Sequence, residues 1–161
     1  MKKTVTLIEL VTVIILIGII TVGLGGFIIQ IIKTYQFVDF RNEVAQEGKK
    51  ALDWMVRDIK EIKDSSSILV ADTSHIQFIN SDDETIDYML SGNIIERNSY
   101  SLCDYVESLE FEYRDANNNV LSPLPLPAGQ RKQIKSIKVT IKLKKGGQQI
   151  EFFSVVFPRN L

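Results

Sequence analysis

The sequence predicts an α+β fold in which a long N-terminal helix, membrane-spanning in its first half, packs on an antiparallel β-sheet. Three observations predict it. Residues 10–32 are mostly apolar and carry no charge, and residues 43–62 repeat apolar side chains at three- and four-residue steps. The remainder alternates apolar and polar residues, which is typical of strands with one buried face. The length of 161 residues suits one globular domain with an appendage.

The uncharged run predicts a membrane anchor. At about 1.5 Å per residue, residues 10–32 make roughly 34 Å of helix, and a bilayer core is about 30 Å thick. No small-x-small cleavage site follows the run, so it differs from a secretory signal peptide. Lys2 and Lys3 precede it, and basic residues stay cytoplasmic. We therefore expect a single-pass protein of the cytoplasmic (inner) membrane, N-terminus inside and C-terminal domain outside.

Three glycines interrupt the run close together, at Gly23, Gly25 and Gly26. Each glycine costs about 0.8–1.0 kcal/mol relative to alanine in a helix interior. The cluster predicts a place where the helix bends or locally unwinds.

The soluble half of the helix has one apolar stripe. No proline occurs between residues 5 and 62, so the membrane helix is expected to continue into it. The segments predicted are a short basic leader (1–4), a transmembrane and assembly helix (5–32), its soluble continuation (33–62) and an exported β-domain (63–161). The stripe comprises Val44, Gly48, Ala51, Leu52, Met55, Ile59 and Ile62.

The strands follow from strict alternation. Alternating segments are expected to bury one face each, with a tight turn at 91–93, and they cover 76–78, 86–90, 109–114 and 137–143. Residues 150–157 are apolar on both faces, which predicts a central strand or one covered on both sides. Residues 122–129 contain three prolines and are expected to form an exposed connecting loop.

Charge and motif content argue against several function classes. The net charge is −1, without the clustered basic face that nucleic-acid binding needs. His75 is the single histidine, and neither a nucleophile elbow nor a phosphate loop is present, so no enzymatic activity and no cofactor are predicted. Cys103 is the single cysteine and is interpreted as a small buried hydrophobe.

Two acidic segments are interpreted as turns, and no metal site is predicted. Residues 115–119 offer oxygens at alternate positions, as a calcium loop begins. Such a loop needs Gly at its sixth position and Glu at its twelfth, where this chain has Val120 and Leu126. The cluster 81–84 is interpreted as a solvated hairpin tip.

Glu9 stands at the entrance of the apolar run. A charged side chain near mid-membrane costs about 2.5–3.5 kcal/mol on insertion scales, and less toward the edge. Either the carboxylate is solvated at headgroup level without a role, or a cation partners it in the membrane.

The residues around Glu9 resemble a type IV prepilin N-terminus, the signature shared by pilins and type II secretion pseudopilins. The match lies in Thr6, Leu7, Ile8, Glu9 and Leu10, after a short lysine-bearing leader and before the apolar run. The resemblance implies cleavage by a prepilin peptidase between Thr4 and Val5 and N-methylation of Val5 by the same enzyme. It also implies that Glu9 pairs with the N-terminal amine of a neighbouring subunit in a filament.

The chain departs from the family pattern at two positions. Thr4 stands where the family has Gly before the cut, and Val5 replaces the usual Phe. If Thr4 blocks cleavage, Glu9 pairs with Lys2 or Lys3, or stays at the interface.

The rest of the chain resembles the J-type minor pseudopilins and related minor pilins more faintly, through residues 51–59 and the final strand ending at 157–161. The function predicted is a structural subunit, a minor pilin or pseudopilin, whose partners are other pilin or pseudopilin subunits. Secretion, DNA uptake, adhesion and motility remain open as the process served. The alternative is a monomeric membrane-tethered extracytoplasmic binding module.

Overall fold

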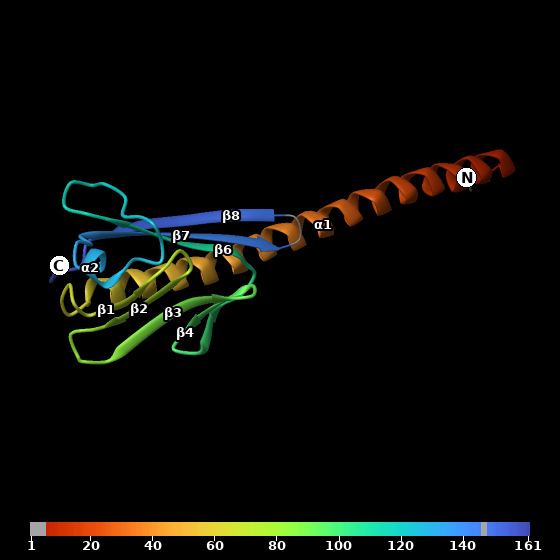
Figure 1. The fold of residues 1–161 in the computed structure, drawn as a ribbon. Coiled ribbons are helices and arrows are strands. Elements are labelled where there is room, and N and C mark those ends of the chain that lie inside the picture. Colours follow the sequence, from red (N-terminus) through yellow and green to blue (C-terminus); the bar gives the residue numbers. More distant parts are fainter. Residues whose placement is uncertain (1–5, 146–147) are drawn as a thin grey trace. The chain divides into compact units, whose positions relative to one another are not determined.

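A long helix and two antiparallel sheets form the described part of the chain. The computed structural model describes residues 6–145 and 148–161, without the side chains of 36–41 and 148. The helix α1 runs unbroken over Leu7–Lys60 (Figure 1). Contacts divide the chain into two units, Met1–Asn42 and Glu43–Leu161. The α+β arrangement predicted from the sequence is therefore confirmed.

The first unit contains the apolar part of α1. Its segment Leu7–Tyr35 is long and apolar enough to span a membrane, with a mean hydropathy of 2.7 over 18 residues. The hydroxyls of Thr12, Thr21 and Thr34 donate to carbonyls one turn earlier, at 2.8, 2.8 and 2.9 Å. These bonds satisfy the hydroxyls within the helix, as a lipid environment requires. Residues 23–26 are helical, and their flexibility stays a prediction.

The second unit begins with the amphipathic part of α1. Its buried face confirms the predicted stripe except at Leu52, which is half-buried, and the helix ends at Lys60, two residues before the predicted end. The reason is that Ile62 forms a β-bridge with Asn80, which requires extended backbone. The buried helical residues are Val44, Gly48, Ala51, Met55, Asp58 and Ile59.

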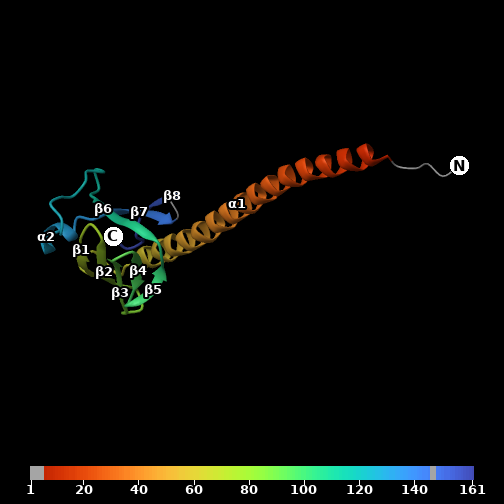
Figure 2. The same ribbon diagram turned by 90° about the vertical axis from the view of Figure 1, so that its right-hand side faces the viewer.

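The first sheet is a five-stranded meander in chain order, and Figure 2 shows β5 at its end beside β4. Its longer strands confirm the predicted alternation by burying Ile76, Phe78, Ile86 and Tyr88, and Gly92 turns the chain at a φ of 63°. The predicted turn leads into Ile94 and Ile95, the start of the fourth strand, whereas the strands at 68–71 and 100–103 were not predicted, because four residues are too few to display alternation. The strands are β1 (Ile68–Ala71), β2 (His75–Ile79), β3 (Thr85–Ser91), β4 (Ile94–Arg97) and β5 (Tyr100–Cys103).

The second sheet has the order β6-β7-β8, formed by Val106–Arg114, Ser136–Lys145 and Gln148–Val156. A short helix, α2 (Ala128–Arg131), precedes β7. We expected a single sheet. Two form because the chain turns away after β5, with Tyr105 at a φ of 60°, and β6 then pairs with β7.

The prediction for the last strand was wrong. β8 is an edge strand, and its outward side chains Phe153, Val155 and Phe157 are 64%, 47% and 68% exposed. An apolar pattern on both faces leads to burial only where a layer packs on each face. Here α1 packs on the inner face, and among the described residues the outer face is left exposed.

The domain segment of α1 contacts both sheets. Gly48 faces Leu143 and Phe152 of the three-stranded sheet, and a β-carbon at Gly48 would lie 2.5 Å from Leu143 Cδ1. Asp58, ten residues later, bonds to the five-stranded sheet through Tyr88 and Arg97. Figure 1 accordingly shows β6–β8 above this part of α1 and β3–β4 below it.

Candidate functional site

The N-terminus of α1 contains the residues that the sequence singled out. Thr6 directly precedes the helix, and its carbonyl accepts from the backbone N–H groups of Glu9 at 3.1 Å and Leu10 at 3.2 Å. The Glu9 carboxylate turns back to Thr6. Its Oε2 lies 3.4 Å from the Thr6 backbone nitrogen and 3.5 Å from Thr6 Oγ1.

This contact is one half of a capping box, in which a Glu three residues into the helix accepts from the N–H of the capping residue. The Thr-x-x-Glu spacing of Thr6 and Glu9 is the sequence signal for this cap. The prediction for Glu9 considered an intersubunit pair and did not include the cap. The negative charge also lies at the positive end of the helix dipole, which is worth about 0.3–1 kcal/mol. Glu9 therefore has a role within its own helix.

Glu9 is nevertheless isolated from other charges along the span. Between residues 6 and 38, Lys33 is the only other charged residue. The motif residues Leu7, Ile8 and Leu10 are exposed around the carboxylate. In a membrane this site combines a carboxylate with an apolar surface, and such a carboxylate is stabilised by an approaching cation. The predicted cleavage and methylation positions, Thr4 and Val5, lie outside the described residues, as do Lys2 and Lys3.

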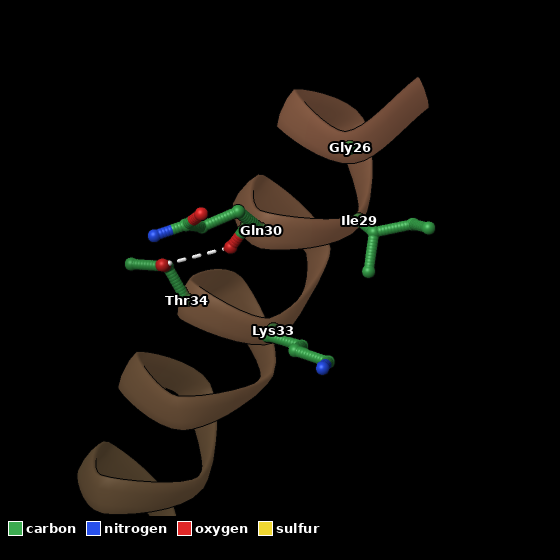
Figure 3. A pocket seen from close by; sticks show the side chains of 5 residues that line it. All are labelled: Gly26, Ile29, Gln30, Lys33 and Thr34. Atoms are coloured by element: carbon green, nitrogen blue, oxygen red, sulfur yellow. Dashed lines mark hydrogen bonds between the residues drawn. The ribbon is translucent and has the colours of Figure 1, made fainter. Parts of the chain in front are cut away.

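A shallow hollow lies on α1 near the other end of the span. Gly26 lacks a side chain there, and Figure 3 shows Gln30 and Thr34 pointing to one side while Ile29 and Lys33 point to the other. The Thr34 hydroxyl donates to the Gln30 carbonyl at 2.9 Å. All of the lining residues belong to one helix, so the hollow encloses nothing. A small residue beside polar ones is the kind of surface that lets a second helix approach closely.

Asp58 anchors α1 to the five-stranded sheet. This carboxylate is 5% exposed and accepts from Tyr88 Oη at 2.7 Å and Arg97 Nε at 2.8 Å. Burial, together with the neighbouring Asp58 charge, raises the pKa of Tyr88 well above its ordinary value. The neutral phenol therefore remains a donor at any physiological pH.

The exposed side of the same helical turn is aromatic and cationic. The guanidinium groups of Arg57 and Arg97 lie 5.4 and 5.5 Å from the centre of the Trp54 ring. The adjacent residues Arg57 and Asp58, on which part of the resemblance depends, thus have different roles. Arg57 packs over Trp54 outside, and Asp58 is bonded inside. No sequence signal identified Tyr88 and Arg97 as partners of Asp58, since they lie 30 and 39 residues away.

The two acidic segments form turns, as predicted. The Asp115 carboxylate accepts from the backbone N–H groups of Asn117 at 2.9 Å and Asn119 at 2.8 Å. The bonds from Asn119, with a smaller contribution from Asn117, lower the pKa of Asp115. Residues 81–84 form the exposed connection between β2 and β3.

The remaining titratable candidates are His75 and Cys103. His75 Nε2 lies 2.7 Å from Asp87 Oδ1 across β2 and β3. Within residues 6–145 and 148–161, no three His, Cys, Asp or Glu side chains are grouped as a metal site requires. Cys103 is buried, as predicted, and burial raises the pKa of its thiol to about 12.

Comparison of the chain with models of known protein families and with curated proteins finds no match.

Proposed function

We propose that this chain is a structural subunit, a minor pilin or pseudopilin, of a type IV pilus, type II secretion or DNA-uptake filament. It assembles through the N-terminal part of α1, with the N-terminus on the cytoplasmic side of the membrane and the β-domain outside. Its partners are other subunits of the same class and a prepilin peptidase that cleaves before Val5 and methylates it.

One observation above all supports this proposal, namely the place of Glu9. A carboxylate stands among exposed apolar side chains at the start of a segment long enough to span a membrane. A lone anchor gains only a helix cap from a charge there, whereas a packed bundle of such helices also gains a directional contact with the amine of a neighbour. Breaking a buried ion pair costs about 3–5 kcal/mol, which is sufficient to control assembly.

The alternative function is a monomeric, membrane-tethered binding module outside the cytoplasm. The observation that favours it is the contact between Glu9 and Thr6. It gives the carboxylate a partner in its own chain, at 3.4 Å, without any neighbour.

Two substitutions of Glu9 separate these functions. Glu9→Gln removes the charge but keeps an oxygen acceptor of the same reach, and Gln serves in a capping box as Glu does. Glu9→Ala removes both the charge and the cap. Assembly through Glu9 predicts that both variants lose co-purification and crosslinking with other subunits at least tenfold, while membrane fractionation stays unchanged.

The matched control is Asp53→Asn, which removes one exposed carboxylate elsewhere on α1. It should assemble as the wild type does. If Glu9→Gln also assembles as the wild type does and Glu9→Ala alone is impaired, capping is the role of Glu9 and the filament proposal loses its main support.

A further inference from the structure

The three-stranded sheet ends in an unprotected edge at β8. Its nine residues pair with β7 along one side only. Natural edge strands are usually protected by lysines, prolines or bulges. In β8 the register with β7 is continuous, and neither lysine nor proline occurs between residues 149 and 157.

The outward face of this edge is apolar. Phe153, Val155 and Phe157 alternate along the strand, and about half or more of each side chain is exposed. On the inner face, Ile150 and Phe152 are only half-buried, because no further strand lies beyond them. An added strand would satisfy the free backbone groups and cover apolar side chains on both faces.

The direction of β8 determines which partner fits. Phe152 lies beside Gly48, near the start of the domain helix, and the backbone N–H of Arg159 donates to the Lys60 carbonyl at 3.2 Å, at its end. The strand and helical segment 43–60 therefore run in the same direction, as Figure 1 also shows. A twofold pairing of two β8 strands is antiparallel, so it would place residue 43 of the two copies at opposite ends of the pair. If two copies are anchored in one membrane, as the proposed function requires, both enter the domain from the membrane side, and this favours a partner other than a twofold copy.

Charge at the edge indicates the chemistry of the partner. Phe153, Val155 and Phe157 form an exposed apolar strip. Just before this strip, Glu151 of β8 lies opposite Lys142 of β7. Farther along, the ammonium of Lys138 lies 5.8 Å from the centre of the Phe153 ring, and Arg159 follows the strip. Among the ion pairs of the described residues, neither Lys138 nor Arg159 has a carboxylate partner. Glu112 of β6 lies opposite Lys138 but forms its ion pair with Arg114, so both cations are available to carboxylates of a docked segment.

We propose that β8 is the docking edge for an extended segment of a second, non-identical filament subunit. The segment has apolar side chains at alternate positions and carboxylates that meet Lys138 and Arg159. This inference rests on the proposed function, since it takes the partner from the same assembly.

Photocrosslinking of the full chain in its native membranes tests the proposal. The photoreactive residue benzoyl-phenylalanine replaces Val155, which is exposed at the middle of the strip. We expect an adduct with another pilin-class subunit, and mass spectrometry should place it on an extended segment that carries acidic residues. Phe153→Lys and Lys138→Glu, each combined with this residue, should lower adduct yield at least tenfold.

Tyr100→Lys provides the matched control, because Tyr100 is an exposed aromatic residue on β5 of the other sheet, 79% exposed. It should leave the adduct unchanged. An adduct between differently tagged copies of this chain, or with lipid alone, would overturn the proposal. An adduct that neither Phe153→Lys nor Lys138→Glu weakens would overturn it as well.

Failure here is distinguishable from failure of the proposed function. If co-purification with other subunits depends on Glu9 but no protein adduct forms at residue 155, the docking edge is refuted and the filament role stands. If the adduct forms with a protein that is not a filament subunit, the docking edge is refuted, and the filament role is refuted as well only if co-purification does not depend on Glu9.

Discussion

The phenol oxygen of Tyr88, on β3, lies 2.7 Å from the carboxylate of Asp58, on α1, and the same carboxylate oxygen accepts from Arg97 on β4. One buried charge thus joins the helix to two strands. Because both donors come from the five-stranded sheet, this contact determines how the helix lies on that sheet.

Asp58→Ala should therefore destabilise the domain more than Tyr88→Phe does. The first leaves Arg97 without its anion and should cost about 3 kcal/mol, the low end for buried pairs, because the Arg97 side chain is 28% exposed. The second removes one hydrogen bond to a charge and should cost about 1.5–3 kcal/mol. Urea unfolding of the full chain in detergent micelles measures both, with Tyr100→Phe as the control that should change nothing.

Gly48→Ala should destabilise the packing of α1 on the three-stranded sheet. The new methyl group would lie 2.5 Å from Leu143 Cδ1 and 2.8 Å from Phe152 Cε2, so both side chains must move. Overpacking of this kind costs about 1–3 kcal/mol, and the gain in helix propensity offsets up to about 1 kcal/mol of it.

The control for Gly48→Ala is Gly129→Ala, where a methyl group meets nothing within 4 Å. Gly48→Ala combined with Leu143→Val should recover part of the lost unfolding free energy, since the shorter side chain vacates the space. Equal stability of Gly48→Ala and the wild type would show that the helix shifts freely on this sheet.

Cys103 should resist alkylation in the folded protein. Burial raises the pKa of its thiol from 9.0 to about 12, and the carboxylates of Glu47 and Asp104 add to the shift. At pH 8 the thiolate fraction is then about a thousandfold lower than that of a free thiol. Iodoacetamide should modify the native chain about three orders of magnitude more slowly than the chain in urea.

The same shift affects stability at high pH. A raised pKa in the folded state contributes stability that is fully present below pH 9 and is lost as the pH rises from 9.0 to about 12. Cys103→Ser should flatten the fall in unfolding free energy over that range. Rapid labelling of native Cys103 at pH 8 would contradict the buried, neutral thiol.

Deletion of residues 1–32 should leave a soluble, folded α+β domain. The buried face of α1 from Val44 onward is covered by the two sheets, and the unit Glu43–Leu161 is set apart from the preceding segment by its own internal contacts. Circular dichroism should show mixed helix and sheet, with cooperative thermal unfolding. A disordered or purely helical spectrum would contradict a separable domain.

The native chain should begin at Val5 and be methylated there, if the peptidase accepts Thr4 in place of Gly. Mass spectrometry of protein purified from its own membrane measures this directly, and Thr4→Gly is the matched variant that restores the family's residue. A wild-type chain that retains Lys2 and Lys3, beside a Thr4→Gly chain that loses them, would identify Thr4 as the block.

Elements whose signal is local and repeated could be predicted from the sequence. The uncharged run, the helical stripe and the alternating strands each depend on the period of apolar residues, and a period can be read from a short window. Glu9 was identifiable in the same way, because one carboxylate in an apolar run is conspicuous. Its capping contact with Thr6 was also within reach, since the spacing Thr-x-x-Glu is local.

Which elements contact one another could not be predicted in this way, because it depends on long-range packing. The pairing of Asp58 with Tyr88 and Arg97 joins residues 30 and 39 positions apart, and no local pattern encodes such a pair. Likewise, the apolar pattern of β8 predicts burial on both faces, but α1 packs on the inner face alone, and within the described residues the outer face stays exposed. Periodicity specifies which face of an element is apolar, whereas the partner of that face depends on long-range packing.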